Sequence, residues 1–264
     1  MIGHQARKRF GQHFLHDAGV INGIVAAVNP KPGEHLVEIG PGEGAITLPL
    51  LQHVRKMTVI ELDRDLVPRI TAMTANLGEV DVIQADVLTV DLAELAGDRK
   101  LRVVGNLPYN ISSPILFHCI NQLDAIADMH FMLQKEVVDR MAAGPGSKVY
   151  GRLSVMLQLA CVVEPLFDVP PSAFRPPPKV DSAIVRLIPR PAHERPLALM
   201  PTISRIVRAA FGQRRKTLSN ALNGVASASQ MRDAGIDPAD RAEQLPLSAF
   251  VQLAAVLANT EAVG

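Results

Sequence analysis

Five short β-rich runs, separated by stretches with helical spacing, lie in the amino-terminal two-thirds of the chain and restrict the folds that it can adopt. Asp17–Val28 is typical of the intervening stretches, with apolar residues on one face and Asp17 placed to cap the helix. Strands that alternate with helices form crossover units, so we predict an α/β fold with a mainly parallel sheet. Ligands bind such sheets where the carboxyl ends of the strands meet. The five runs are HLVEI (35–39), MTVIE (57–61), DVIQ (81–84), LRVVG (101–105) and MHFML (129–133).

The sequence changes character after Val169. The proline-dense segment PPSAFRPPPK cannot form a regular helix. One more strand, DSAIVRLIP, follows it, and from Pro191 onward the spacing of apolar residues is helical. We therefore predict two domains, an α/β domain over residues 1–190 and a small all-helical domain over residues 191–264.

Composition limits the class of protein. Apolar residues make up 48% of the 264, enough for a substantial core, yet no run reaches the ~18 consecutive apolar residues of a membrane span. The basic amino terminus lacks the apolar core of a signal peptide. Cys119 and Cys161 are isolated, which indicates neither a disulfide framework nor a zinc site. These features predict a soluble cytoplasmic protein without a metal.

Charge is distributed unevenly along the chain. The net charge is only +1, but the segment from Arg175 to Lys216 holds ten Lys or Arg residues against two acids. The rest of the chain holds seventeen basic and twenty-four acidic residues. A second basic group, Arg7, Lys8 and Arg9, lies near the amino terminus. Two basic groups on an otherwise acidic chain favour a polyanionic partner such as a nucleic acid, although solvated surface charge is the simpler alternative for either group alone.

A glycine-rich segment, EIGPGEGAITL (38–48), follows the first predicted strand and opens a helix. Its glycines, including Gly40 and Gly42, allow a sharp turn and close approach to a ligand. Glu61 ends the next strand, twenty-one residues after Gly40, where a ribose-binding acid is expected, and Asp86 ends the third. A nicotinamide dinucleotide and S-adenosylmethionine both fit this nucleoside pocket. The G-x-G-x-G spacing resembles the methyltransferase loop more than the dinucleotide fingerprint.

The segment NLPY (106–109) ends the fourth predicted strand. A simple turn accounts for the asparagine and the proline but not for Tyr109. The segment resembles the (D/N)PP(Y/F) signature of methyltransferases that act on exocyclic amines of bases, with Leu107 in place of the first proline.

This resemblance assigns a role to each residue of the segment. The side-chain oxygen of Asn106 and the carbonyl of Leu107 would accept hydrogen bonds from the target amine, and Pro108 would stiffen the turn. Tyr109 would stack on an extruded or unpaired base. Phe174 is a candidate for the second stacking ring, or alternatively a core residue that holds its loop in place.

The ordered set of motifs resembles the bacterial KsgA family of small-subunit (16S) ribosomal RNA adenine dimethyltransferases. The motifs are RKRFGQHFL, VEIGPGEGAIT, VIELD, QAD, GNLPYNISSPI, MLQKEV, YGRLSV, PPSAFRPPPKVDS and QRRKT. The resemblance implies a Rossmann-like methyltransferase domain and a helical carboxyl-terminal domain that binds RNA or the ribosome. It also implies a monomer that dimethylates two adjacent adenines near the 3′ end of small-subunit rRNA. The substrate would be a small ribosomal subunit or its precursor, late in biogenesis.

The resemblance also implies which residues contact S-adenosylmethionine. Glu61 would bind the ribose hydroxyls and Asp86 the adenine amine. The family usually reads QNFL where this chain reads QHFL, so His13 replaces an asparagine. The implied cofactor-binding residues are His13, Leu15, Gly40, Gly42, Glu61, Asp86 and Asn106.

Selection of the RNA is expected from the basic residues rather than from the pocket, because the pocket contacts one base at a time. We expect phosphate contacts from Arg7, Lys8, Arg9, Arg214, Arg215 and Lys216.

Three alternatives to the small-subunit enzyme remain. Methyltransferases that modify large-subunit RNA share the same fold, but MLQKEV, YGRLSV and QRRKT favour the small-subunit family. A nucleic-acid-binding assembly or transcription factor with a relic pocket is opposed by the intact Glu61, Asp86, Asn106 and Tyr109. A nicotinamide oxidoreductase leaves NLPY unexplained.

Overall fold

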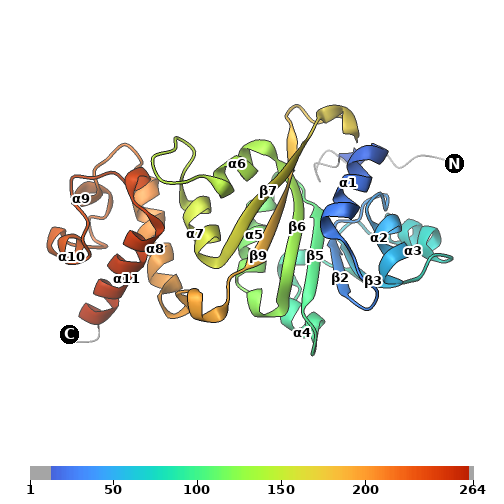
Figure 1. The fold of residues 1–264 in the computed structure, drawn as a ribbon, viewed down its shortest axis with the longest axis horizontal. Coiled ribbons are helices and arrows are strands. Elements are labelled where there is room, and N and C mark those ends of the chain that lie inside the picture. Colours follow the sequence, from blue (N-terminus) through green and yellow to red (C-terminus); the bar gives the residue numbers. More distant parts are fainter. Residues whose placement is uncertain (1–12, 262–264) are drawn as a thin grey trace. The chain divides into compact units, whose positions relative to one another are not determined.

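The α/β part of the chain is built on a seven-stranded sheet in a computed structural model that describes residues 13–261 (Figure 1). Its strand order is β4-β3-β2-β5-β6-β9-β7, and β1 and β8 form a separate two-stranded sheet. The strands are β1 (Phe14–Leu15), β2 (His35–Ile39), β3 (Lys56–Glu61), β4 (Glu79–Gln84), β5 (Leu101–Asn106), β6 (Ile126–Gln134), β7 (Cys161–Val169), β8 (Phe174–Arg175) and β9 (Ser182–Pro189).

The first five strands of this order run parallel, and β9 pairs with β6 in the antiparallel direction. This arrangement confirms the predicted α/β fold with a mainly parallel sheet. The sequence did not reveal β7, because Glu164, Pro165 and Asp168 interrupt its apolar pattern. A proline is tolerated there because β7 is an edge strand, where a backbone donor can be absent without loss of a ladder bond.

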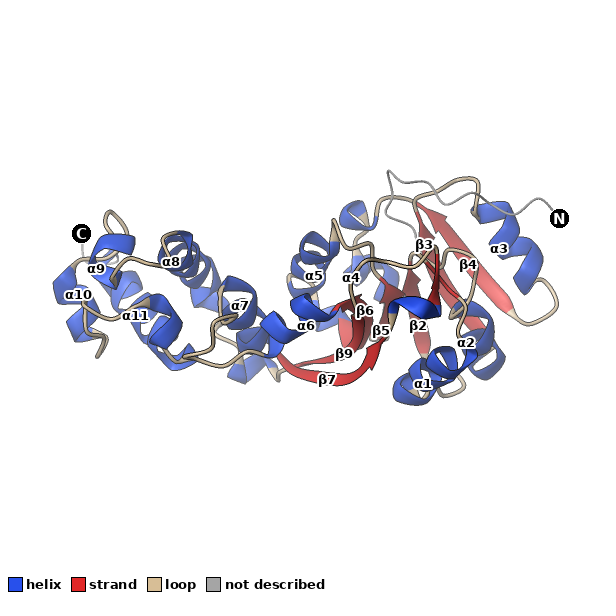
Figure 2. Ribbon diagram, turned by 90° about the horizontal axis from the view of Figure 1, so that it is seen from above, coloured by secondary structure: helices blue, strands red, loops and turns tan. Residues whose placement is uncertain are grey.

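Helices cover both faces of the sheet, with α1 and α2 on one face and α5 on the other (Figure 2). Helix α1 begins as the sequence predicts, because the Asp17 carboxylate accepts a hydrogen bond of 2.9 Å from the Val20 N–H. The α-helices of residues 13–142 are α1 (Ala18–Val28), α2 (Thr47–Val54), α3 (Val67–Thr74), α4 (Leu92–Ala96), α5 (Ser112–Ile120) and α6 (Lys135–Ala142).

The chain divides into two compact units that differ in one respect from the predicted domains. The first contains residues up to Val138 together with Glu164–Pro189, and the second contains Asp139–Val163 together with residues from Arg190 onward. The segment Asp139–Val163, placed in the first domain by the sequence analysis, packs with the helical unit. It does so through Tyr150, which is fully buried and donates a hydrogen bond of 3.0 Å to the Leu245 carbonyl.

The second unit is helical, with α8 and α11 packed around an apolar centre. The ring of Phe211 contacts Tyr150 edge-on and also lies 6.0 Å from Phe250 between centroids. Among residues 13–261, no helix combines the length and apolar character needed to cross a membrane. The helices are α7 (Arg152–Ala160), α8 (Met200–Gly212), α9 (Leu218–Ala221), α10 (Ala228–Asp233) and α11 (Leu247–Glu261).

A partly buried guanidinium connects α1 to the middle of the sheet. Arg102 on β5 donates to Asp128 on β6 at 2.8 and 2.9 Å and to Glu34 at 2.7 Å. It also donates to the Val28 carbonyl at the end of α1, at 2.7 Å. Four charge-assisted or backbone contacts thus fix the amino-terminal helix against two neighbouring strands.

We predict that Arg102→Ala lowers the free energy of unfolding by about 3 kcal/mol, because the largely buried Asp128 carboxylate loses both of its hydrogen bonds from Arg102 and keeps the more distant Arg186 guanidinium at 3.7 Å. Chemical denaturation followed by circular dichroism measures this change. The matched control is Arg99→Ala, which removes an exposed side chain whose guanidinium donates to the Gly33 carbonyl and should cost about 0.5 kcal/mol or less. Equal stabilities of the two variants would contradict the prediction.

Candidate active site

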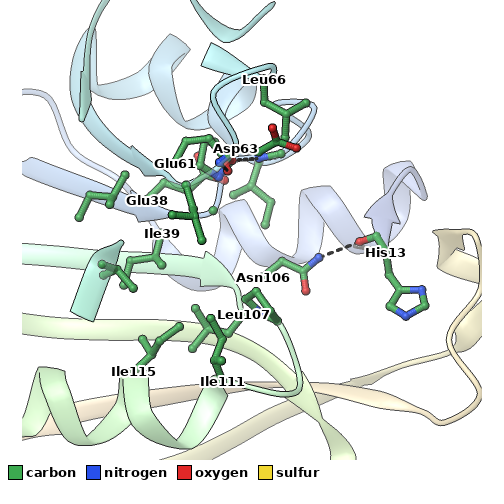
Figure 3. A pocket seen from close by; sticks show the side chains of 18 of the residues that line it. His13, Glu38, Ile39, Glu61, Asp63, Leu66, Asn106, Leu107, Ile111 and Ile115 are labelled. Atoms are coloured by element: carbon green, nitrogen blue, oxygen red, sulfur yellow. Dashed lines mark hydrogen bonds between the residues drawn. The ribbon is translucent and has the colours of Figure 1, made fainter. Parts of the chain in front are cut away.

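A cavity of about 340 Å³ lies where the carboxyl ends of β2, β3, β4 and β5 meet. This volume is within the range of roughly 300–1,000 Å³ that small-molecule sites occupy. The structure brings most of the predicted site residues to its wall (Figure 3). Those lining it are His13, Leu15, Gly40, Gly42, Glu61, Asp86, Asn106, Leu107, Pro108 and Tyr109.

The glycine-rich loop has the conformation that its sequence requires. Gly40, Gly42 and Gly44 have φ angles of +67°, +57° and +80°, a region that side chains disfavour. A Cβ atom added at Gly40 would meet no heavy atom within 4 Å. The glycine there is therefore required by the backbone angle, and the space beside it remains open to a ligand.

Glu61 is buried at the end of β3, with 6% of its surface exposed. One carboxylate oxygen accepts the Asp63 N–H at 2.8 Å and the other accepts the Gly42 N–H at 3.4 Å. Burial raises the pKa of Glu61, and these backbone hydrogen bonds partly oppose the rise. The carboxylate is thus held in a fixed position facing the loop.

Asp86 occupies a more open part of the wall. Its carboxylate accepts a hydrogen bond of 3.0 Å from the Leu88 N–H and caps the short helical turn after β4. The side chain is exposed, so its remaining acceptor positions are accessible to a ligand.

Glu38 is a cavity residue that the sequence analysis did not single out. It is 1% exposed, and its Oε2 accepts a hydrogen bond of 2.6 Å from the Thr47 hydroxyl. Burial, with a smaller contribution from the charge of Glu61, raises the pKa of Glu38 to about 7, and the Thr47 hydrogen bond opposes this rise. The sequence did contain a signal for Glu38, because an acid stands in the apolar run HLVEI at a position where a core residue is expected.

A hydrogen bond to the main chain of His13 orients the Asn106 amide. Its Nδ2 donates a hydrogen bond of 3.1 Å to the His13 carbonyl, as Figure 3 shows. Within the described part of the chain, no donor bonds to Asn106 Oδ1 or to the Leu107 carbonyl. Leu107 itself is buried, and its N–H donates to the Met132 carbonyl at 3.1 Å. Two oxygen acceptors therefore remain available on a rigid turn.

Tyr109 is fixed at both its hydroxyl and its ring. The hydroxyl lies 2.6 Å from Ser182 Oγ, and the ring stacks on that of His13 with centroids 5.8 Å apart. Burial raises the pKa of Tyr109, and the Ser182 hydrogen bond opposes this rise. His13 is held in turn by a contact of 2.8 Å between Nδ1 and the Pro176 carbonyl. One face of the Tyr109 ring is therefore occupied by His13.

Phe174 does not reach the cavity. It is 2% exposed and belongs to the apolar core, where β8 pairs with β1 and Phe174 lies opposite Leu15. This position corresponds to the second of the two predicted roles, in which Phe174 holds its loop in place. In this structure its ring has no face open to a base.

The predicted RNA-binding residues are in different situations. Arg7, Lys8 and Arg9 lie outside the described residues. Arg214 is engaged within the helical unit, because its Nε donates to Glu243 at 3.1 Å and its Nη2 to the Ser147 carbonyl at 3.4 Å. Arg215 and Lys216 are exposed and form no ion pair with any residue of 13–261. They are the better candidates for phosphate contacts.

No three His, Cys, Asp or Glu side chains come together as ligands for a metal ion within the part of the chain described by the structure.

Solved structures similar to this one define the class as methyltransferases. A dimethyladenosine transferase from Plasmodium falciparum superposes with a TM-score of 0.80 at 26% identity, covering 91% of this chain and 96% of that one. The 23S rRNA methyltransferase ErmE superposes with a TM-score of 0.71 at 25% identity, covering 93% and 99%. Both similarities confirm the Rossmann-like methyltransferase fold.

Sequence comparison identifies the family within this class. The profile of the ribosomal RNA adenine dimethylase family matches residues 3–259, and the chain belongs to that family. Ribosomal RNA small subunit methyltransferase A of Xylella fastidiosa is 61% identical over 251 residues, covering 94% of this chain and 95% of the relative. The protein of the same name from Xanthomonas campestris pv. campestris is 59% identical, covering 95% and 96%.

We predict that Gly105→Ala destabilises the floor of the site, because its Cβ would lie 2.6 Å from the Ile39 carbonyl oxygen of the neighbouring strand. The backbone cannot yield without shifting Asn106, so unfolding free energy should fall by about 1–3 kcal/mol. Thermal and denaturant unfolding measure the change. Gly144→Ala, where an added Cβ meets nothing within 4 Å, is the control, and equal losses in both variants would refute the steric argument.

Proposed function

We propose that this protein uses S-adenosylmethionine to dimethylate the N6 amines of two adjacent adenines near the 3′ end of small-subunit rRNA. It acts in the cytoplasm as a monomer, on a small ribosomal subunit or its precursor late in biogenesis. Family membership supports the reaction, and the names of relatives 59–61% identical support the small subunit. The 25% identity with ErmE gives less support to a large-subunit substrate.

The observation that carries the proposal is an acidic cavity with the NLPY turn on its wall. Five acids line the cavity, and none of the described lining residues is Lys or Arg. A dinucleotide would bring a negatively charged pyrophosphate into this surrounding, where like charges repel. S-adenosylmethionine carries a positive sulfonium, a positive ammonium and one carboxylate, so its net positive charge complements the acidic wall. The five acids are Glu38, Glu43, Glu61, Asp63 and Asp86.

The positions of the individual groups fit the parts of this cofactor. Glu61, held at the end of β3, is placed to accept from the ribose hydroxyls. Asp86 has acceptor capacity for the adenine amine. The open space beside Gly40 suits the methionine end, with His13, Leu15 and Gly42 contributing further wall.

The protein contributes to the reaction mainly by positioning the target amine relative to the methyl group of the cofactor. When bound, S-adenosylmethionine supplies a methyl group that is already activated as a sulfonium. The N6 lone pair of adenine is delocalised into the ring, so the amine must be drawn toward tetrahedral geometry. Asn106 Oδ1 and the Leu107 carbonyl accept from its two N–H groups and favour that geometry. Pro108 restricts the turn that aims the second oxygen.

Tyr109 provides the stacking surface for the extruded adenine. Base stacking on an aromatic ring is worth about 1–3 kcal/mol. Because His13 covers one face of the ring, the adenine stacks on the opposite face or displaces His13. The Ser182 hydrogen bond keeps the ring from turning as the base enters. The mechanism proposed here assigns no general base, metal or covalent nucleophile.

We predict that Asn106→Ala lowers methyl transfer at least a hundredfold and changes cofactor affinity by much less, because it removes an acceptor for the target amine. The assay transfers labelled methyl groups to small subunits that lack the modification and identifies the modified nucleoside. Calorimetric titration of the cofactor is the parallel measurement. Near-normal turnover would refute the role of Asn106, and labelled nucleosides other than N6-methylated adenines would refute the proposed reaction.

We predict that replacing Arg215 and Lys216 by Ala flattens the salt dependence of small-subunit binding. Each lost phosphate contact should reduce the slope of log affinity against log salt by about 0.7–0.9. Arg232→Ala, which removes an exposed cation from α10, and Arg214→Ala, which removes one already paired with Glu243, are the controls. A double variant with the same slope as the wild type would show that Arg215 and Lys216 do not contact the phosphates.

A further inference from the structure

Glu38 is a buried acid that the proposed reaction does not yet use. It lies on β2 between β3 and β5, two residues before Gly40, and its side chain lines the cavity. The Thr47 hydroxyl donates to Oε2, and no donor among the described residues bonds to Oε1. A carboxyl group that is 1% exposed and has one hydrogen bond is poorly solvated as an anion.

The groups around Glu38 do not compensate its charge. Glu61 and Asp63 face the cavity from the end of β3, Glu43 from the glycine loop and Asp86 from the turn after β4. The β5 side contributes the neutral Asn106, and the amino-terminal segment contributes His13. A positively charged ligand would compensate the negative charge of Glu38, because the described lining residues include no Lys or Arg.

We propose that Glu38 is a further residue of the cofactor site, one that gives up its proton when the positively charged methionine end of S-adenosylmethionine binds. This inference rests on the proposed function, because it needs a cationic cofactor beside the glycine loop. The step is balanced: the neutral carboxyl group releases one proton to solvent, and the carboxylate that remains pairs with the cofactor's positive charge. No covalent bond of the cofactor changes in this step.

Proton release makes cofactor affinity depend on pH. In the free protein Glu38 has a pKa of about 7, so it is neutral below that pH. In the complex the neighbouring positive charge lowers the pKa of Glu38, so the carboxylate persists to lower pH. The complex therefore holds fewer protons than the free protein below pH 7. Affinity should rise with pH up to about 7, and it should fall about fivefold between pH 7 and pH 6, a range in which the α-amino group of the cofactor stays largely protonated.

The test is isothermal titration of S-adenosylmethionine into the full-length protein in buffers of different ionisation enthalpy. We expect release of most of one proton per bound cofactor at pH 6 and of a smaller fraction at pH 7. The α-amino group of the cofactor titrates near 8, so it stays protonated at pH 6 and largely so at pH 7. Uncharged 5′-methylthioadenosine should bind without releasing a proton from Glu38, and this comparison needs no variant.

Two variants assign the proton to a residue. Glu38→Gln keeps the size and the bond from Thr47 but should abolish proton release and flatten the pH dependence of affinity. Glu43→Gln, which neutralises an exposed acid of the same cavity, should preserve both. Binding without proton exchange at pH 6, or equal release by Glu38→Gln and wild type, would overturn the inference. Failure of the wild-type protein to bind S-adenosylmethionine at any pH would instead overturn the proposed function.

Discussion

The parallel alignment of β2, β3, β4 and β5 is the constraint on which the site depends. Parallel strands direct their carboxyl ends to one edge, so Gly40, Glu61, Asp86 and Asn106 meet there although they are distant in the sequence. Strands β2 and β5 approach each other closely at Gly105, where a side chain would have no room beside the Ile39 carbonyl. That contact places the NLPY turn directly beside the glycine loop.

In the proposed function, the two compact units have different tasks. The cavity, the glycine loop and NLPY all belong to the first unit, and the exposed Arg215 and Lys216 belong to the helical unit. A cavity that contacts a single base carries little information about the RNA around it. In the proposed function, discrimination among RNAs depends on cations outside the cavity. Because Arg214 is paired with Glu243, Arg215 and Lys216 are the better candidates for these cations.

Local signals predicted the parts of the structure that depend on local patterns. The strands of the parallel sheet, the Asp17 cap and the strand-end residues followed from apolar spacing and from the short motifs. Long-range packing determined the rest. The strand β7 carries a proline that only an edge position permits, and Phe174 is buried because β8 pairs with β1. Asp139–Val163 joins the helical unit through Tyr150, a contact between residues nearly a hundred positions apart that local periodicity cannot show.

The hydrogen bond between Asn106 Nδ2 and the His13 carbonyl has a consequence for how the sequence can vary. The amide is oriented by a main-chain atom, which every residue type at position 13 provides. Exchange of the usual asparagine for histidine therefore leaves the acceptor geometry of Asn106 intact, while the new ring lies against Tyr109. A substitution at position 13 therefore preserves the hydrogen bond that orients Asn106, and in the proposed function it would change only the side chain that the adenine meets beside Tyr109.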